Sequence, residues 1–176
     1  MKEIRTNLEG ERVFIRRLRL SDANDVYVNV RDKEIVKWSL NIPHPYPKRI
    51  AAKFIRKSQR EWRAKKGFVF GVVFKKTGRV IGVTGLKNID RKSNSAEIGY
   101  WLGKNYWRRG LATEAVRLVL KFGFKELKLH RIYAHVFEKN TGSKLVLEKC
   151  GFKLEGECVK LCLNGVGDTI CSITGF

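Results

Sequence analysis

One segment, residues 97–115, constrains the fold of this chain more than any other; it reads EIGYWLGKNYWRRGLATEA. Its first part alternates as a strand does, with Ile98, Tyr100 and Leu102 on one face. Its last part has the spacing of an amphipathic helix, whose apolar face carries Leu111, Ala115, Leu118, Val119 and Phe122. The segment therefore predicts a strand that leads through a basic turn, Trp107–Thr113, into the start of a helix.

The basic turn has the features of an anion-binding site. Backbone N–H groups at a helix N-terminus are unpaired, and the helix dipole favours negative charge there. Arg108 and Arg109 add positive charge, and Gly110 would let a phosphate approach the backbone closely. The chain contains neither G-x-x-x-x-G-K-[ST] nor G-x-G-x-x-G, so the sequence disfavours a nucleotide-hydrolysing P-loop and a dinucleotide-binding fold.

A second segment, His130–Gly156, predicts another strand and another helix. Ile132, Ala134 and Val136 would share one face of a strand, and Thr141–Lys149 predicts a helix that Gly151 ends in a left-handed conformation.

With these residues the chain resembles the GCN5-related N-acetyltransferase (GNAT) superfamily. Within it, the chain is similar to the RimJ/RimL branch, which acetylates the N-termini of ribosomal proteins. The likeness runs from about Val13 over nearly the whole chain, and the matching elements follow one another in the family's order: Ala96–Trp101, Trp107–Ala115, His130–Ile132, Asn140 with Ser143, and Glu148–Phe152.

Further elements follow from local signals in the sequence. A strand is predicted at Val13–Leu18 and a helix from Ser21, as its N-cap, to about Asp32. Three prolines make Asn41–Pro47 a loop. A basic helix is predicted at Lys48–Lys66, followed by strands at Phe68–Phe74 and Val80–Leu86 that a turn at Lys76–Gly78 joins. A further turn is predicted at Arg91–Asn94. A last hairpin pairs Phe152–Leu163 with Asp168–Ile173 through a turn at Asn164-Gly165.

This order of elements predicts a mixed α/β sheet covered by helices. The resemblance implies the acyl-CoA N-acyltransferase (GNAT) fold, with about seven strands, four helices and two central parallel strands that splay apart. Coenzyme A would enter between these strands, Ile98–Leu102 and Arg131–Val136. We expect a single N-acetyltransferase domain at residues 13–176, preceded by an N-terminal extension at residues 1–12.

The net charge of +20 restricts the partners of the chain. It is explained either by a well-solvated surface or by attraction to polyanions, such as coenzyme A, RNA or the ribosome. The same field would repel a polyamine or an aminoglycoside, although a local acidic pocket could overcome that repulsion. The apolar runs are too short to span a membrane and the N-terminus is unlike a signal peptide, so we expect a cytoplasmic protein.

The resemblance implies acetyl-CoA as cosubstrate and no metal. It assigns to acetyl-CoA the backbone of the splayed strand, the basic turn and the start of the second helix. These residues are Ile98, Tyr100, Leu102, Arg108, Arg109, Gly110, Leu111, Ala112, Thr113, Asn140 and Ser143.

Three residues are predicted to carry the chemistry of direct transfer to an amine. Glu97 is a candidate general base or a structural carboxylate, and a backbone N–H at Tyr100 is a candidate oxyanion donor. Ser143 either protonates the leaving thiolate or bonds to the helix backbone. Asn140 is an N-cap, a pantetheine contact or both. Glu155 and Glu157 are weaker alternative bases.

The loop residues His44 and Tyr46 are candidate contacts to the acceptor, because this loop roofs the substrate mouth in relatives. The prediction is an N-acetyltransferase that acts on a primary amine, first of all a protein N-terminal α-amine. The alternatives are acetylation of a small-molecule amine, or an inactive member of the fold that binds RNA or the ribosome.

The cysteines suggest no metal site. Cys150, Cys158, Cys162 and Cys171 form no C-x-x-C pair and have no histidine at metal-binding spacing, so zinc is disfavoured. They are expected to be buried thiols, and the alternative, for a hyperthermophilic source, is a cross-strand disulfide of Cys158 or Cys162 with Cys171.

Overall fold

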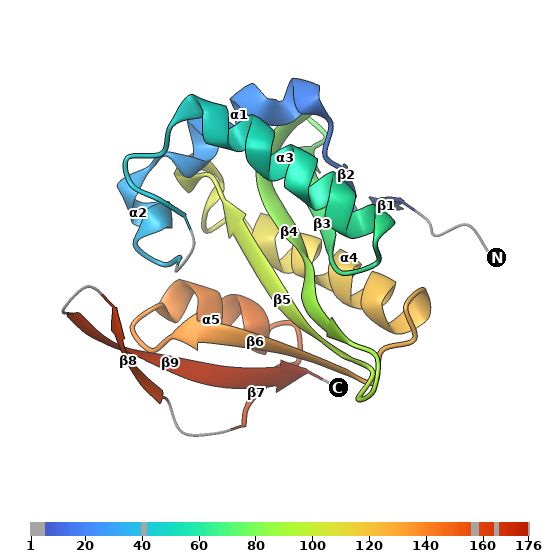
Figure 1. Ribbon diagram of the computed structural model, residues 1–176, viewed down its shortest axis with the longest axis vertical. Helices are drawn as coiled ribbons and strands as arrows, with labels where there is room; N and C mark the ends of the chain where they lie inside the picture. Colours follow the sequence, from blue (N-terminus) through green and yellow to red (C-terminus); the bar gives the residue numbers. More distant parts are fainter. Residues whose placement is uncertain (1–5, 40–41, 156–158, 164–165, 176) are drawn as a thin grey trace.

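The computed structural model describes residues 6–39, 42–155, 159–163 and 166–175, and side chains up to residue 155. These residues form one mixed sheet with helices on both faces (Figure 1). The strands are β1 (Asn7–Glu9), β2 (Val13–Arg17), β3 (Phe68–Phe74), β4 (Arg79–Asp90), β5 (Ser95–Leu102), β6 (Arg131–Phe137), β7 (Lys153–Leu154), β8 (Val159–Leu163) and β9 (Val166–Gly175). The α-helices are α1 (Ala23–Val30), α2 (Lys33–Val36), α3 (Lys48–Arg63), α4 (Leu111–Lys125) and α5 (Thr141–Glu148).

The strand order is β1-β2-β3-β4-β5-β6-β9-β7, and β8 pairs with β9. The predicted mixed fold is confirmed, with more elements than the pattern showed. Strand β1 pairs with β2, so the sheet begins upstream of the expected start at Val13. The strand predicted at Phe152–Leu163 is divided into β7 and β8, which both pair with β9. The turn at Asn164-Gly165 lies outside the described residues.

Two apolar layers hold the helices against the sheet. Helix α4 covers one face, where Trp62, Phe68, Phe70 and Phe122 form a cluster of ring contacts with centroids 4.9–6.0 Å apart. Such pairs each add about 0.5–1.5 kcal/mol to what burial provides. Helices α1 and α3 cover the other face through a second cluster that includes Val26, Ile55 and Val83.

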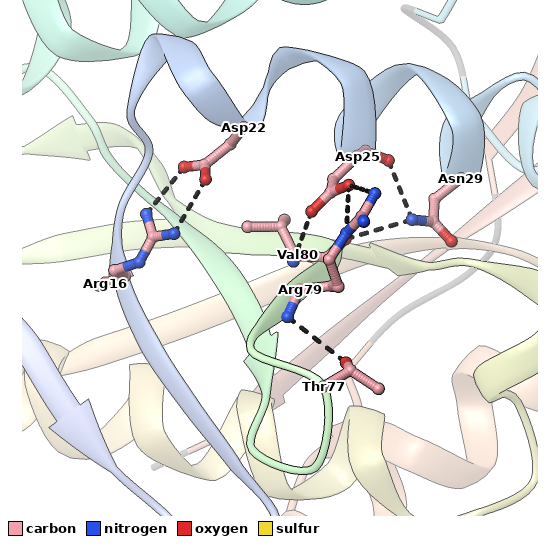
Figure 2. Close-up of polar contacts among 7 residues, drawn as sticks. All are labelled: Arg16, Asp22, Asp25, Asn29, Thr77, Arg79 and Val80. Atoms are coloured by element: carbon pink, nitrogen blue, oxygen red, sulfur yellow. Dashed lines mark hydrogen bonds and ion pairs between the residues drawn. The ribbon is translucent and has the colours of Figure 1, made fainter.

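Polar contacts fix α1 on the β3–β4 hairpin (Figure 2). The Asp25 carboxylate accepts from the Arg79 guanidinium and, at 3.1 Å, from the Val80 N–H. The Asn29 amide donates to the Val80 carbonyl at 3.2 Å. Because the carboxylate also accepts from a backbone group, this contact sets the position of α1 and does more than an exposed ion pair would.

The predicted start of the first helix is wrong. Ser21 lies inside a 3-10 turn, Leu20–Asp22, and α1 begins at Ala23 and ends at Val30. Asp22, one residue later, is the acceptor: it takes a hydrogen bond from the Arg19 N–H at 2.7 Å. It also accepts two from Arg16, at 2.7 and 2.9 Å (Figure 2). A carboxylate that faces a guanidinium makes stronger hydrogen bonds than a serine hydroxyl can. Here the guanidinium belongs to Arg16, on β2.

Candidate active site

The central parallel strands separate after a short region of pairing. Residues Ser95–Glu97 of β5 pair with Arg131–Tyr133 of β6. Beyond that, the described pairing of β6 is with β9, up to Phe137, and Figure 1 shows β5 and β6 diverging from their shared end. Within the described part of the chain, Ile98–Leu102 therefore has no strand partner on its β6 side. The predicted splay is confirmed, and it leaves backbone groups of β5 able to bind an extended ligand.

The basic turn and the start of α4 form a candidate anion cradle. Arg108 and Gly110 adopt left-handed conformations, with φ of 57° and 73°, and both arginines of the turn are exposed. No side chain caps the helix at Gly110, so the first N–H groups, at Leu111, Ala112 and Thr113, carry no side-chain cap. A side chain at position 110 would crowd this opening, since its Cβ would lie 3.1 Å from the Arg12 guanidinium. A diphosphate fits such an opening by charge and by donor set.

Arg12 is a part of this cradle that the sequence did not indicate. Its Nη1 donates to the Arg109 carbonyl at 2.7 Å, and its Nε lies 3.2 Å from the Glu114 carboxylate. The other Glu114 oxygen accepts from the backbone N–H groups of Arg12 and Val13, at 2.8 and 3.1 Å. Glu114 would otherwise place a negative charge in the first turn of α4. These contacts neutralise it and bring a third arginine to the turn.

Ser143 and Tyr100 meet across the gap between β5 and α5. The Tyr100 hydroxyl lies 2.8 Å from the Ser143 Oγ and donates to the Ser143 carbonyl at 3.1 Å. Burial raises the pKa of the Tyr100 hydroxyl, so it remains a protonated donor. The Asn140 side chain accepts from the Ser143 N–H at 3.1 Å, which confirms its role as an N-cap. Tyr100 thus holds the Ser143 hydroxyl, and Asn140 holds the Ser143 backbone N–H.

Glu97 lies in a polar cluster on the face of the sheet covered by α1 and α3. Its side chain is 9% exposed. One oxygen lies 2.9 Å from Lys87 Nζ and 3.3 Å from His135 Nδ1, and the other accepts from the Asn88 amide at 2.7 Å. Tyr133 stacks edge-on against His135 with ring centroids 5.4 Å apart. The sequence favoured a structural role for His135 and did not single out Lys87 or Asn88, because the proximity of all three to Glu97 depends on strand register.

The loop before α3 places its two candidate residues differently. His44 is exposed, whereas Tyr46 is 9% exposed and packs in the second apolar cluster. Burial raises the pKa of the Tyr46 hydroxyl. Nearby, Trp38 stacks on Phe137 at the end of β6, with centroids 6.1 Å apart. Contact of His44 and Tyr46 with an acceptor stays a prediction.

The weaker candidates lie apart from this cluster or outside the described residues. Glu155 is exposed and forms an ion pair with Arg131. Glu157 and Cys158 are outside the described residues, as are the side chains of Cys162 and Cys171. Cys150 is a free thiol whose pKa is raised by burial.

The described residues offer neither a cluster of metal ligands nor a membrane-spanning helix. No three His, Cys, Asp or Glu side chains in them gather as a metal site would require. None of the described helices combines the length and apolar composition that a membrane crossing requires.

Comparisons with known proteins agree with this geometry. Residues 12–153 match the model of the acetyltransferase (GNAT) domain. The chain is 36% identical to the uncharacterized N-acetyltransferase p20 of Bacillus licheniformis over 153 residues, which is 85% of this chain and 83% of p20. It is 35% identical to the probable N-acetyltransferase YjcK of Bacillus subtilis over 164 residues, 90% of this chain and 91% of YjcK. Among solved structures, the ribosomal-protein-S5-alanine acetyltransferase of Vibrio fischeri superposes with a TM-score of 0.86 at 26% identity, covering 97% of this chain and 96% of that one.

Proposed function

Since this chain belongs to the GNAT acetyltransferase family and is an acetyl-CoA-dependent N-acetyltransferase, we propose that it acetylates the N-terminal α-amine of a protein, with ribosomal proteins as the first candidates. Acetyl-CoA is the acetyl donor throughout the family, whereas the amine that accepts the acetyl group differs between its members. The acceptor must therefore be argued from this chain's own surface.

The observation that carries the proposal is the basic surface of α3. All nine Lys and Arg residues between positions 48 and 66 are exposed, and Glu61 is the one acidic residue of the helix. Glu61 forms a single exposed ion pair, 3.6 Å from Lys57 Nζ, which neutralises little of this charge. Such a surface attracts RNA and repels a polycationic substrate, so it favours an acceptor that is bound to RNA or destined for it.

Similarity over the full chain supports the same acceptor class. The Vibrio fischeri structure, which aligns with 97% of this chain, is that of an enzyme named for the alanine of ribosomal protein S5. A free protein N-terminus carries one positive charge, and the +20 field opposes it far less than it opposes a polyamine.

The donor would be held by groups of this chain that carry no other described role. The diphosphate of coenzyme A would lie at the start of α4, against the backbone N–H groups of Leu111, Ala112 and Thr113 and beside Arg108 and Arg109. The amide-rich arm would follow the unpaired edge of Ile98–Leu102, where the Tyr100 N–H would donate to the carbonyl oxygen of the thioester. Removing such a donor costs a factor of ~10²–10³ in rate. Ser143 would protonate the departing sulfur.

A panel of acceptors tests the proposal. A peptide with a free α-amine is compared with the same peptide N-terminally blocked and carrying one lysine, and with spermidine, using release of free thiol as the readout. We expect turnover with the free α-amine peptide alone. Turnover confined to spermidine would reject a protein acceptor, and turnover confined to the blocked peptide would move the reaction to lysine side chains.

The basic surface is tested separately by ribosome co-sedimentation at ~0.15 M salt, where charges beyond ~8 Å are screened. Charge reversal of Arg56, Lys57 and Arg60 should abolish co-sedimentation and spare acetylation of a short free peptide. The matched control reverses Lys121, Lys125 and Lys128, three exposed lysines at the far side of the sheet, and changes the net charge equally. Equal loss in both variants would mean that net charge, and not the surface of α3, governs binding.

A further inference from the structure

The polar cluster around Glu97 holds two groups that could receive a proton, and they differ in availability. The Glu97 carboxylate is buried, and both of its oxygens already have partners. His135 contacts it through Nδ1 alone, and 43% of the His135 side chain is exposed. The ring therefore has a second nitrogen, Nε2, for which no described contact exists.

Protonation of Glu97 by a substrate would disturb the contacts that hold it. A proton on one oxygen would compete with the Lys87 ammonium at 2.9 Å, and a proton on the other would displace the Asn88 amide at 2.7 Å. The surroundings of Glu97 thus suit a carboxylate that accepts fixed hydrogen bonds and orients a neighbour.

We propose that His135 is the group that takes the proton from the acceptor amine, through Nε2, and that Glu97 is the positioning residue that orients its ring. This inference rests on amine acetylation as the reaction of this chain, but not on which amine is acetylated.

The contact between Glu97 and His135 selects the useful form of the ring. A carboxylate 3.3 Å from Nδ1 favours the neutral tautomer that carries its proton on Nδ1, which leaves a lone pair on Nε2. The same division of labour occurs wherever a buried carboxylate orients a catalytic imidazole.

Strand geometry places this base opposite the group that protonates the sulfur. Successive side chains of a strand point to opposite faces, so Glu97 faces α1 and α3 while Tyr100 faces the α4 side. Ser143, held by Tyr100, therefore lies on the α4 side of β5, where the anion cradle also lies. His135 would meet the amine on one side of the gap, while Ser143 would meet the sulfur on the other.

In the proposed acetyl transfer, His135, Ser143 and water account for every proton that moves. The acceptor enters as a neutral amine, and its nitrogen lone pair forms the N–C bond as the C–S bond breaks with its electron pair going to sulfur. The nitrogen gives one proton to Nε2 of His135, which passes it to water. The Ser143 hydroxyl gives a proton to the sulfur and recovers one from water. The products are an amide and a free thiol.

The charged and titratable groups described around the ring come from β4, β5 and β6, and β9 is the neighbouring strand. Strand β5 contributes Glu97 and β4 contributes Lys87, which pairs with that carboxylate. On β6, Tyr133 contacts the ring and Arg131 lies over Tyr133, 5.8 Å from its centroid. Strand β9 places Ser172 at the register position opposite His135. Burial and then the charge of Glu97 raise the pKa of the Tyr133 hydroxyl, which keeps it neutral while an imidazole titrates.

The test combines a pH–rate profile with chemical rescue. The substitution His135→Asn retains a donor where Nδ1 stood but provides no proton acceptor. We expect kcat/KM at pH 7 to fall ~10²-fold or more, and the acidic limb assigned to the imidazole to vanish. The titration of the acceptor amine is the same in both proteins, so the difference between profiles isolates the ring. In His135→Ala, added imidazole should restore turnover.

Controls separate catalysis from folding. His130→Asn removes an exposed histidine at the edge of the same strand and should leave the profile unchanged. Coenzyme A affinity, measured by calorimetry, should be the same in all variants because His135 lies away from the cradle. A wild-type profile in His135→Asn, or an inactive His135→Ala that binds coenzyme A normally and is not rescued by imidazole, would overturn the proposal. Wild-type protein inactive with every amine would instead refute the acetyl transfer on which it rests.

Discussion

Substitution of Gly110 by alanine would test the anion cradle most directly. The residue has a φ of 73°, and an added Cβ would lie 3.1 Å from the Arg12 Nη2. Gly78, in the β3–β4 turn, has a φ of 66° and has nothing within 4 Å of an added Cβ. Gly78→Ala therefore reproduces the backbone strain of Gly110→Ala without its steric contact, and it serves as the matched control.

The strain affects both variants alike. An alanine in the left-handed region costs about 1–2 kcal/mol, while the loss of glycine freedom in the unfolded chain returns about 0.4–1 kcal/mol. The net loss of unfolding free energy should therefore be on the order of 1 kcal/mol in each. Gly110→Ala should lose somewhat more, because displacing the Arg12 guanidinium endangers its 2.7 Å bond to the Arg109 carbonyl.

The affinity for coenzyme A distinguishes Gly110→Ala from Gly78→Ala. A Cβ at position 110 would hold a phosphate away from the first N–H groups of α4, and one charge-assisted hydrogen bond is worth ~1.5–3 kcal/mol. The dissociation constant of coenzyme A should then rise ~10- to 100-fold in Gly110→Ala and stay at its wild-type value in Gly78→Ala. Calorimetry measures the affinity, and urea unfolding measures the stability. Equal coenzyme A affinity in the two variants would refute the cradle.

Three further predictions concern single side chains. Ser143→Ala should lower kcat more than it raises KM, because the proton is needed only as the sulfur departs; an unchanged kcat would give that role to water. Tyr100→Phe removes the 2.8 Å contact to the Ser143 Oγ, and we expect a loss of about 1 kcal/mol in urea unfolding and a smaller fall in kcat than Ser143→Ala causes. Burial tends to raise the pKa of the Asp22 carboxyl, but hydrogen bonds from Arg16 and the Arg19 N–H bring it below its usual value. The ionised Asp22 carboxylate therefore stabilises the folded state above its unfolded pKa of about 4, and this stabilisation is lost as the pH falls through the lower folded pKa. Asp22→Asn should then flatten the acid limb of a plot of unfolding free energy against pH. An unaltered limb would contradict this.

Local patterns in the sequence were sufficient for most elements of this fold. The alternation in β5 and β6, the helical spacing of α4, the turn at Gly78 and the left-handed Gly151 agree with their predictions. Each depends on a few neighbouring residues, whose φ preferences and apolar spacing are set within one or two turns of chain. The cradle at the start of α4 belongs to this class, because a helix N-terminus and its basic turn are contiguous.

Contacts between distant residues were decided only by the tertiary structure. Arg12 reaches Glu114 across 102 positions. Glu97 meets Lys87 through the β4–β5 register and His135 through the parallel pairing of β5 with β6. A change of one residue in either register would turn these side chains to the other face. The sequence alone therefore determined where a diphosphate could bind, whereas the partners of Glu97, and with them the candidate proton acceptor, depend on how the strands align and where they separate.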